Sequence, residues 1–183
     1  VLPYPRWADE GAVEVALALR AELIEAEGRG VLENLADVEI GSYDVAIEII
    51  GRDPEKWQPA TRETADHSFP YCVAVALVDG RVTMNSFSSK RLRDPRLHEL
   101  MKKVHVVNLP EFERRYPTTM PTRITVRTAQ GAVYSRQVDQ PLGHPGHPMS
   151  DREVEDKLRR LALRKVDRAR IHSLLDFVWH LEK

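Results

Sequence analysis

Apolar residues recur at helical spacing in several separate stretches of the chain. From Asp9 to Glu27 they return at steps of three and four residues, and Gly28 and Gly30 follow directly, so we expect a helix that ends at the glycines. A shorter helix is predicted after Asp94, because aspartate is a favoured N-cap and Pro95 suits the first helical position.

Other stretches alternate between apolar and polar residues, as half-buried strands do. Strands are expected at Lys103–Val107 and in a hairpin of Thr122–Thr128 and Ala132–Val138, which flank the turn sequence AQG. The stretch Leu35–Ile50 is longer. Its first part is typical of a strand, whereas its second part fits a strand or a helix, because the run is too short to separate the two periods.

The C-terminal part differs in composition. QPLGHPGHPMS is dense in Gly, Pro and His, and Ser150 and Glu153 then have the spacing of a capping box that starts a helix. A final helix is expected from about Val166 to Leu181, with one apolar stripe. The stripe consists of Ile171, Leu174, Leu175, Val178 and Leu181. This stripe needs a partner surface, which a chain of this length does not readily supply.

The order of these elements predicts an α+β fold in two parts. Residues 1–140 are expected to form a small sheet with a hairpin and packed helices. Residues 141–183 are expected to supply the Gly/Pro/His-rich loop and two helices that pack elsewhere.

The stretch TRETADHSFPYCVAVALVDG, from Thr61 to Gly80, combines a polar beginning with an apolar body. Proline is tolerated only in the first turn of a helix, so Pro70 predicts a helix that begins near Asp66 or His67, with Asp66 as its N-cap. From Phe69 to Val78 the helix is apolar on every side, which predicts that it is buried all round.

His67 and Tyr71 are spaced i and i+4, so they are expected to project from one face at the start of this helix. The positive end of the helix dipole disfavours imidazolium there and favours a bound carboxylate. A neutral histidine and a phenol at such a place suit proton transfer on a carboxylate substrate. The alternative is a capping histidine beside a half-buried core tyrosine, and the spacing alone favours that alternative.

Composition narrows the class of partner. The 183 residues are 42% hydrophobic and 30% charged, with a net charge of −1, which argues against a protein that binds nucleic acid or an anionic membrane. No apolar run approaches the ~20 residues of a membrane span, and no signal peptide opens the sequence. The single cysteine, Cys72, lies in an apolar run, so we expect a buried, inert thiol. These features fit a cytoplasmic protein.

Two further features raise the possibility of a ligand. His144 and His147 stand three apart in a Gly/Pro loop without a neighbouring acidic or thiol ligand, so we favour a rigid loop over a metal site and expect no metal. The basic runs KRLRDPR and KLRRLALRKVDR contain interleaved acidic residues. We therefore interpret both runs as solvated helix faces rather than a nucleic-acid site.

Four stretches together resemble one known family. They are LPYPRWADEGAVEVALALR, TRETADHSFPYCVAVALVDG, RLRDPRLHELMKKVHV and PLGHPGHPMSDREVEDKLRRLA. In this order they resemble the MmgE/PrpD family, which includes 2-methylcitrate dehydratase, cis-aconitate decarboxylase and iminodisuccinate epimerase. The resemblance is collinear and covers nearly the whole chain.

The resemblance implies which residues form the site. It places Tyr71 at the family's active-site tyrosine, His67 at the histidine four residues earlier, and Ser68 beside them at the mouth of the pocket. The first stretch departs from the family pattern, because Leu2 stands where active members have a lysine. Arg6 then becomes the candidate cation for a substrate carboxylate.

The resemblance also implies an architecture and a reaction. The chain would be the C-terminal part of the enzyme, with an α+β lid and two helices that return to an N-terminal helical domain outside this chain. The enzyme would be a homodimer without a cofactor that dehydrates a small polycarboxylate such as 2-methylcitrate or citrate, and this chain alone would be inactive. Tyr71 would give or take a proton, and His67 would position it or share that role.

Two alternatives remain open. Decarboxylation of cis-aconitate or an epimerisation shares the same proton transfer beside a carboxylate, and nothing in the sequence selects among the three reactions. A non-catalytic binding or scaffold module that keeps the lid fold is favoured by Leu2, whereas His67, Ser68 and Tyr71 speak against it.

Overall fold

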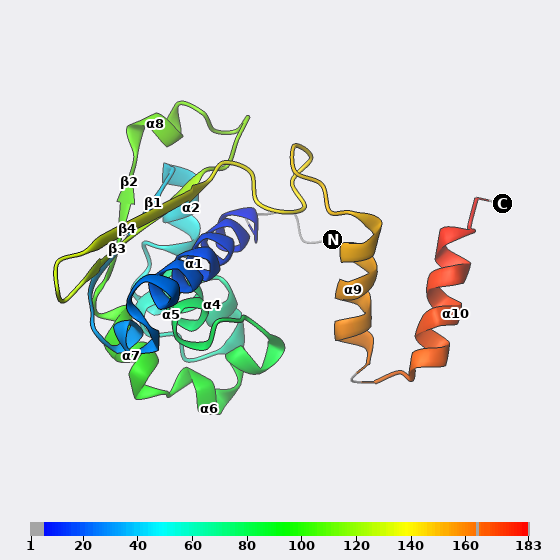
Figure 1. Cartoon of the computed structure of the whole chain (residues 1–183). Coiled ribbons are helices and arrows are strands. Elements are labelled where there is room, and N and C mark those ends of the chain that lie inside the picture. Colours follow the sequence, from blue (N-terminus) through cyan, green and yellow to red (C-terminus); the bar gives the residue numbers. More distant parts are fainter. Residues whose placement is uncertain (1–5, 164, 183) are drawn as a thin grey trace. The chain divides into compact units, whose positions relative to one another are not determined.

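A computed structural model describes residues 6–163 and 165–182, with side chains from residue 10 onward. The chain divides into two compact units, Val1–Pro141 and Leu142–Lys183 (Figure 1). The first unit is a mixed α+β layer structure, and the second is a loop followed by a pair of helices. The predicted α+β class is therefore confirmed.

The first unit is built on a four-stranded sheet with the order β2-β1-β3-β4. Its strands are β1 (Leu35–Ser42), β2 (Val104–Asn108), β3 (Thr122–Thr128) and β4 (Val133–Val138). β1 pairs in parallel with β2 and antiparallel with β3, and β3 and β4 form an antiparallel hairpin. The predicted hairpin and the strand predicted at Lys103–Val107 are confirmed. Both were predictable because alternate residues of a strand point to opposite faces of the sheet.

One face of the sheet carries the core. Val38 and Ile40 lie opposite Val126 and Ile124 across the β1–β3 pair, and all four side chains are fully buried. The other face carries polar side chains, among them Glu39, which pairs with His105 on β2. This division is the expected one for a sheet that is covered on one side only.

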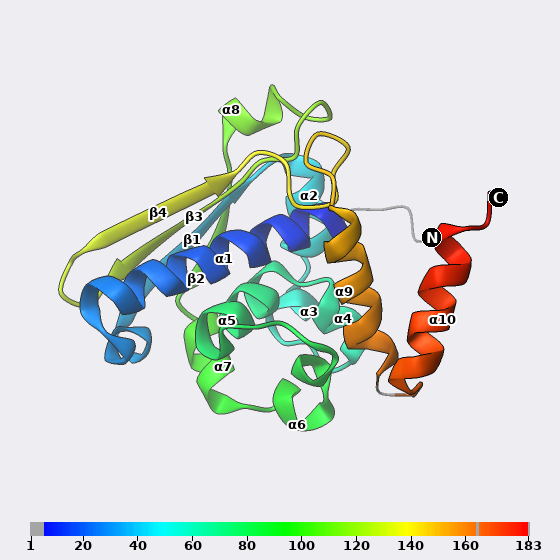
Figure 2. The same ribbon diagram turned by 45° about the vertical axis from the view of Figure 1, so that its right-hand side comes forward.

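Helix α1 (Arg6–Glu27) covers the core face. It packs on β3 and β4 and also on α5 (Phe69–Asp79), and both views show it lying along the sheet (Figures 1 and 2). Two polar contacts fasten it to β4: the Tyr134 hydroxyl donates to Glu27 and Arg136 pairs with Glu22, each over 2.7 Å. The sequence placed this helix correctly, although it begins three residues earlier than predicted.

Short helices connect these elements. They are η1 (Arg29–Glu33), α2 (Asp44–Ile50), α3 (Pro54–Trp57), α4 (Arg62–Asp66), η2 (Met84–Phe87), α6 (Ser89–Leu92), α7 (Pro95–Met101) and α8 (Pro110–Glu113), where η1 and η2 are 3-10 helices. The ambiguous second part of Leu35–Ile50 is thus the helix α2, which buries Ala46, Ile47 and Ile50 along one stripe. The predicted cap of α7 is confirmed, because the Asp94 carboxylate accepts from the Arg96 N–H.

Helix α5 forms the centre of the first unit. Every residue from Phe69 to Leu77 is buried, which confirms the predicted burial on all sides except at Val78, which is partly buried. The helix ends at Gly80, whose left-handed backbone (φ 67°) favours glycine. Cys72 is buried within it and is not in a disulfide, as expected for a structural thiol.

The second unit contains α9 (Asp151–Ala162) and α10 (Arg168–Trp179). The predicted capping box is present, because the Ser150 hydroxyl accepts from the Glu153 N–H and the Glu153 carboxylate accepts from the Ser150 N–H. Within the α10 stripe, Ile171 and Leu175 are buried. Several large apolar residues of the same region are exposed: Leu174, Phe177, Val178, Trp179 and Leu181.

None of the helices in the described residues is long and apolar enough to cross a membrane.

Candidate functional site

The helical backbone is interrupted between His67 and Ser68. The sequence predicts a single helix start at this place. His67 caps the C-terminal end of α4, and Ser68 is the N-cap of α5, so the predicted N-cap role of Asp66 is wrong. Pro70 lies in the first turn of α5, as expected, but the cap directly precedes Phe69 instead of lying two residues further back. His67 and Tyr71 therefore belong to different elements, and the prediction that they share one helix face is also wrong.

Tyr71 lies inside the protein rather than at the mouth of a pocket. Its side chain is 0% exposed, its hydroxyl donates a 2.6 Å hydrogen bond to the Ser86 carbonyl, and its ring lies 6.0 Å from that of Phe87. The first turn of α5 is buried as well, so the helix start that was expected to face a carboxylate is covered in this structure. The covering segment is the stretch around η2, which local sequence patterns do not place over Tyr71.

The surroundings of Tyr71 keep it protonated. Burial raises the pKa of the phenol to about 12, because an anion loses its hydration in the core. The Arg91 guanidinium opposes this by favouring phenolate, whereas Cys72, Asp79 and Asp94 reinforce it. Tyr71 is therefore protonated near neutral pH.

Ser68 uses its hydroxyl within the fold. The oxygen accepts from the Tyr71 N–H over 3.1 Å, the hydroxyl donates to the Lys56 carbonyl, and the residue is fully buried. This contact ties α3 to the start of α5 and thereby fixes the backbone that carries Tyr71. A contact between Ser68 and a substrate stays a prediction.

His67 is oriented by two acceptors. Its Nδ1 lies 2.7 Å from the Asp66 carboxylate and 3.1 Å from the Glu63 carbonyl. Since neither of these oxygens donates a proton, Nδ1 carries the hydrogen, and in the neutral form of the imidazole the lone pair is on Nε2. The side chain is 29% exposed.

Asp66 is a further candidate for the site, which the sequence predicts only as a helix cap. Its carboxylate accepts from Nδ1 of His67 over 2.7 Å and so favours one tautomer of the imidazole, as the carboxylate of a catalytic dyad does. The available signal was its position directly before His67. Adjacency alone does not bring two side chains together, because the backbone at His67 must first leave the helical conformation.

The structure describes only the backbone of Arg6, the predicted cation for a substrate carboxylate. Arg6 is the first residue of α1, but its side chain and all of Leu2 lie outside the described residues. The contact between Arg6 and a substrate carboxylate stays a prediction. In the described part of the chain, His67 and Tyr71 share no hydrogen bond: His67 binds Asp66 and the Glu63 carbonyl, and Tyr71 binds the Ser86 carbonyl.

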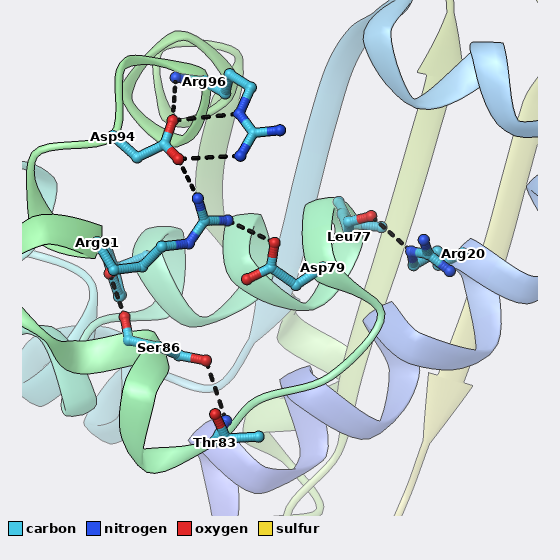
Figure 3. A network of polar contacts seen from close by, with 9 residues as sticks. Arg20, Leu77, Asp79, Thr83, Ser86, Arg91, Asp94 and Arg96 are labelled. Carbon is cyan, nitrogen blue, oxygen red and sulfur yellow. Dashed lines mark hydrogen bonds and ion pairs between the residues drawn. The ribbon is translucent and has the colours of Figure 1, made fainter.

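An arginine links two acidic residues beside this region. Arg91 pairs with Asp79 at the C-terminal end of α5 over 2.5 Å and with Asp94, the N-cap of α7 (Figure 3). Asp94 also binds Arg96, whose hydrogen bond holds the pKa of this carboxyl below its usual range. Arg91 is only 15% exposed, so the interpretation of KRLRDPR as a solvated face is wrong for this residue. The partner Asp79 lies too far back in the sequence to be identified by local charge patterning.

The two loop histidines form a turn. The His147 N–H donates to the His144 carbonyl and the Gly143 N–H donates to the His147 carbonyl, each over 2.8 Å. The Nδ1 of His144 accepts from the Gly146 N–H, and His144 is buried. In residues 6–163 and 165–182, no three His, Cys, Asp or Glu side chains are grouped to hold a metal ion.

Comparisons with known proteins place the chain in a family. Residues 10–182 match the model of the MmgE/PrpD C-terminal domain. The cis-aconitate decarboxylase of Mus musculus is 30% identical over 124 residues, which are 68% of this chain and 25% of the mouse protein. The human cis-aconitate decarboxylase is 31% identical over 128 residues, covering 68% of this chain and 26% of the human protein.

A dehydratase is also similar to the chain. The 2-methylcitrate dehydratase of Cupriavidus necator is 32% identical over 138 residues, which are 73% of this chain and 28% of that protein. The chain thus spans about a quarter of the length of these relatives. The predicted family is confirmed: the chain belongs to the MmgE/PrpD family and corresponds to its C-terminal domain.

Proposed function

We propose that this chain is the lid-bearing part of a lyase that removes water from a small tricarboxylate, 2-methylcitrate or citrate. One observation carries the proposal: within residues 66–71 of a member of this family, a phenol that stays protonated follows closely on an imidazole whose Nδ1 is held by a carboxylate. Elimination of water needs a base for the proton beside the carboxylate and an acid for the departing hydroxide. A neutral imidazole can act as that base and a protonated phenol as that acid.

We assign the base to His67 and the acid to Tyr71. Nε2 of His67 takes the proton from the carbon beside the carboxylate, and Asp66 stabilises the imidazolium that forms. The Tyr71 hydroxyl gives its proton to the departing hydroxide, which leaves as water. In the structure the Tyr71 hydroxyl donates this proton in a hydrogen bond to the Ser86 carbonyl, so the departing hydroxide must replace that carbonyl as the acceptor.

The remaining side of the pocket is proposed to come from an N-terminal helical domain. The exposed apolar residues Leu174, Phe177 and Val178 on α10 support this, because a helix of a globular protein normally buries such a stripe. Ser68 and Arg6 stay candidates for substrate contacts in the assembled pocket. Without the partner domain, this chain is expected to be inactive.

Two properties of the whole protein accompany the proposal. We propose a homodimer, as the family resemblance implies, and a cytoplasmic location. The single cysteine, which is buried and not in a disulfide, is compatible with a reducing compartment. Sedimentation of the full natural polypeptide measures the first property, and fractionation of its native host measures the second.

A substrate panel tests the reaction. The full natural polypeptide that contains this chain is incubated separately with 2-methylcitrate, citrate and cis-aconitate. The proposal expects formation of an unsaturated tricarboxylate from one of the first two. Release of carbon dioxide from cis-aconitate would instead support the decarboxylase alternative, and inversion of a substrate stereocentre would support an epimerase. Binding without any turnover would support the scaffold alternative.

A further inference from the structure

Arg91 occupies an unusual place for a residue in a basic surface run. Its guanidinium lies between Asp79 and Asp94, and its two terminal nitrogens bind one carboxylate each (Figure 3). Asp94 is itself shared with Arg96, which binds it through both Nε and Nη2. The charges of Arg91 and Arg96 therefore balance those of Asp79 and Asp94. Of the two arginines, Arg91 joins the end of α5 to the start of α7.

The segment between these two carboxylates covers Tyr71. It leaves α5 at Gly80, passes through η2, and returns to the pair formed by Arg91 and Asp79. Within it, Ser86 is held by Thr83: the Thr83 N–H donates to the Ser86 hydroxyl over 3.0 Å, and the Ser86 N–H donates to the Thr83 carbonyl over 2.9 Å. The Ser86 carbonyl is then left to accept from the Tyr71 hydroxyl.

Both ends of the covering segment are thus tied to the C-terminal end of α5. One end is the covalent continuation through Gly80, and the other is the contact between Arg91 and Asp79. A second contact links Arg91 to the middle of the covering segment. The Arg91 backbone N–H donates to the Ser88 carbonyl over 2.8 Å, and Ser88 lies two residues from Ser86. Removing the Arg91 side chain frees one end of the loop while Thr83 still shapes its middle.

We propose that Arg91 is a positioning residue for Tyr71: by binding both Asp79 and Asp94 it holds the segment that places the Ser86 carbonyl against the phenol. The charge of Arg91 also acts on the phenol directly, and in the direction opposite to the Ser86 carbonyl: the carbonyl stabilises the protonated phenol, whereas the guanidinium favours phenolate. Arg91 is the positive group that lowers the pKa of Tyr71, and without it the carboxylates of Asp79 and Asp94, which both raise that pKa, stay behind. The effect on turnover rests on the proposed role of Tyr71 as the acid, whereas the effect on the phenol does not.

The test uses the full natural polypeptide with 3-fluorotyrosine incorporated at position 71, which brings the phenol titration into an accessible pH range. Arg91→Met is compared with Arg96→Met, which removes the other arginine of Asp94 and is matched in size and charge. Arg96 is 70% exposed and does not bind Asp79, so it is the control. Fluorine NMR follows the phenol titration, and steady-state kinetics with the active tricarboxylate give kcat, KM and the solvent deuterium isotope effect.

For Arg91→Met we expect a higher titration midpoint, a loss in kcat of about tenfold with KM changed less than about threefold, and a larger solvent isotope effect. The isotope effect rises because proton donation by a weaker acid limits the rate more strongly. Arg96→Met should leave the midpoint unchanged and kcat within about twofold of the parent enzyme. If Arg91→Met and Arg96→Met behave alike in both measurements, the inference is overturned.

Two further outcomes are decisive. If the parent enzyme turns over no tricarboxylate but the midpoint still rises in Arg91→Met, the proposed reaction fails while the positioning of the phenol stands. If Arg91→Met does not fold, Arg91→Lys decides, because lysine keeps the charge but lacks the planar fork that binds two carboxylates. A kcat about threefold below the parent enzyme supports the inference, and a kcat and midpoint equal to those of the parent contradict it.

Discussion

The hydroxyl of Tyr71 donates a 2.6 Å hydrogen bond to the carbonyl of Ser86, and both residues are buried. This contact joins the start of the central helix α5 to the segment that covers it. It also determines the chemical state of the phenol, because the core that surrounds it disfavours phenolate. The contact therefore bears on the pH dependence of stability, on the packing around α5 and on the proposed acid role of Tyr71.

The first prediction concerns alkaline pH. The pKa of Tyr71 is about 12 in the folded protein and about 10 in an unfolded chain, so the folded state holds the proton more tightly. The stability contributed by this difference is fully present below pH 10 and is lost as the pH rises from 10 to 12, by up to about 3 kcal/mol. Urea denaturation of the parent protein at pH 9 and pH 11.5 measures the loss. Tyr71→Phe, which has no such proton, should lose less stability over the same interval, and equal losses in both proteins would contradict the assignment.

The second prediction concerns the cap of α5. Ser68→Ala removes both the cap of the Tyr71 N–H and the donor to the Lys56 carbonyl, so we expect a loss of about 2 kcal/mol in the free energy of unfolding. Ser88→Ala is the matched control, because Ser88 is exposed and its side chain makes no cap hydrogen bond. Chemical denaturation should separate the two variants clearly. Equal stability of both variants would show that the Ser68 hydroxyl does not support the site.

The third prediction concerns the sheet. A Cβ at Gly41 would lie 2.9 Å from the Cγ of Leu109, and the Leu109 backbone is held by its hydrogen bond to the Ser42 carbonyl. Gly41→Ala should therefore destabilise the protein by about 1–3 kcal/mol through overpacking, measured by thermal or urea unfolding. Gly30→Ala is the control, because a Cβ there meets no atom within 4 Å. A double variant with Leu109→Ala should recover part of the loss, and no recovery would exclude this clash as the cause.

The fourth prediction concerns the orientation of His67. Asp66→Asn replaces the carboxylate that holds Nδ1–H with a neutral amide, so the imidazolium formed during turnover loses its stabilising charge. We expect kcat of the full natural polypeptide to fall about tenfold or more with its preferred tricarboxylate. Glu63→Gln is the control, because Glu63 binds His67 through its backbone carbonyl. Similar rates for both variants would remove Asp66 from the proposed machinery.

Much of the fold was predictable because its signals are local. The alternation in Thr122–Thr128 places Ile124 and Val126 on one face, and both are fully buried in β3. The caps at Asp94 and Ser150 were identified correctly because each combines an acceptor side chain with a proline or a glutamate at the expected spacing. The face of a strand and the cap of a helix each depend on a few neighbouring residues, so both can be predicted from a short stretch of sequence.

The candidate site was less predictable because its geometry depends on distant parts of the chain. Asp66 and Ser68 are both acceptable caps, and the Lys56 carbonyl, which binds the Ser68 hydroxyl, is a contact that no local pattern reveals. Tyr71 was expected at a pocket mouth, but Ser86 arrives from the other end of α5 and covers it. The burial of Arg91 likewise depends on Asp79, which precedes it by twelve residues.

The central claim is that Tyr71 is the acid of the reaction. The most direct measurement compares kcat of the full natural polypeptide with that of Tyr71→Phe, using the tricarboxylate that the parent enzyme dehydrates and verifying by circular dichroism that the variant is folded. Phenylalanine keeps the buried ring next to Phe87 and removes only the hydroxyl that Ser86 accepts. We predict a loss in kcat of at least about tenfold. A folded Tyr71→Phe enzyme with near-normal kcat would contradict the account.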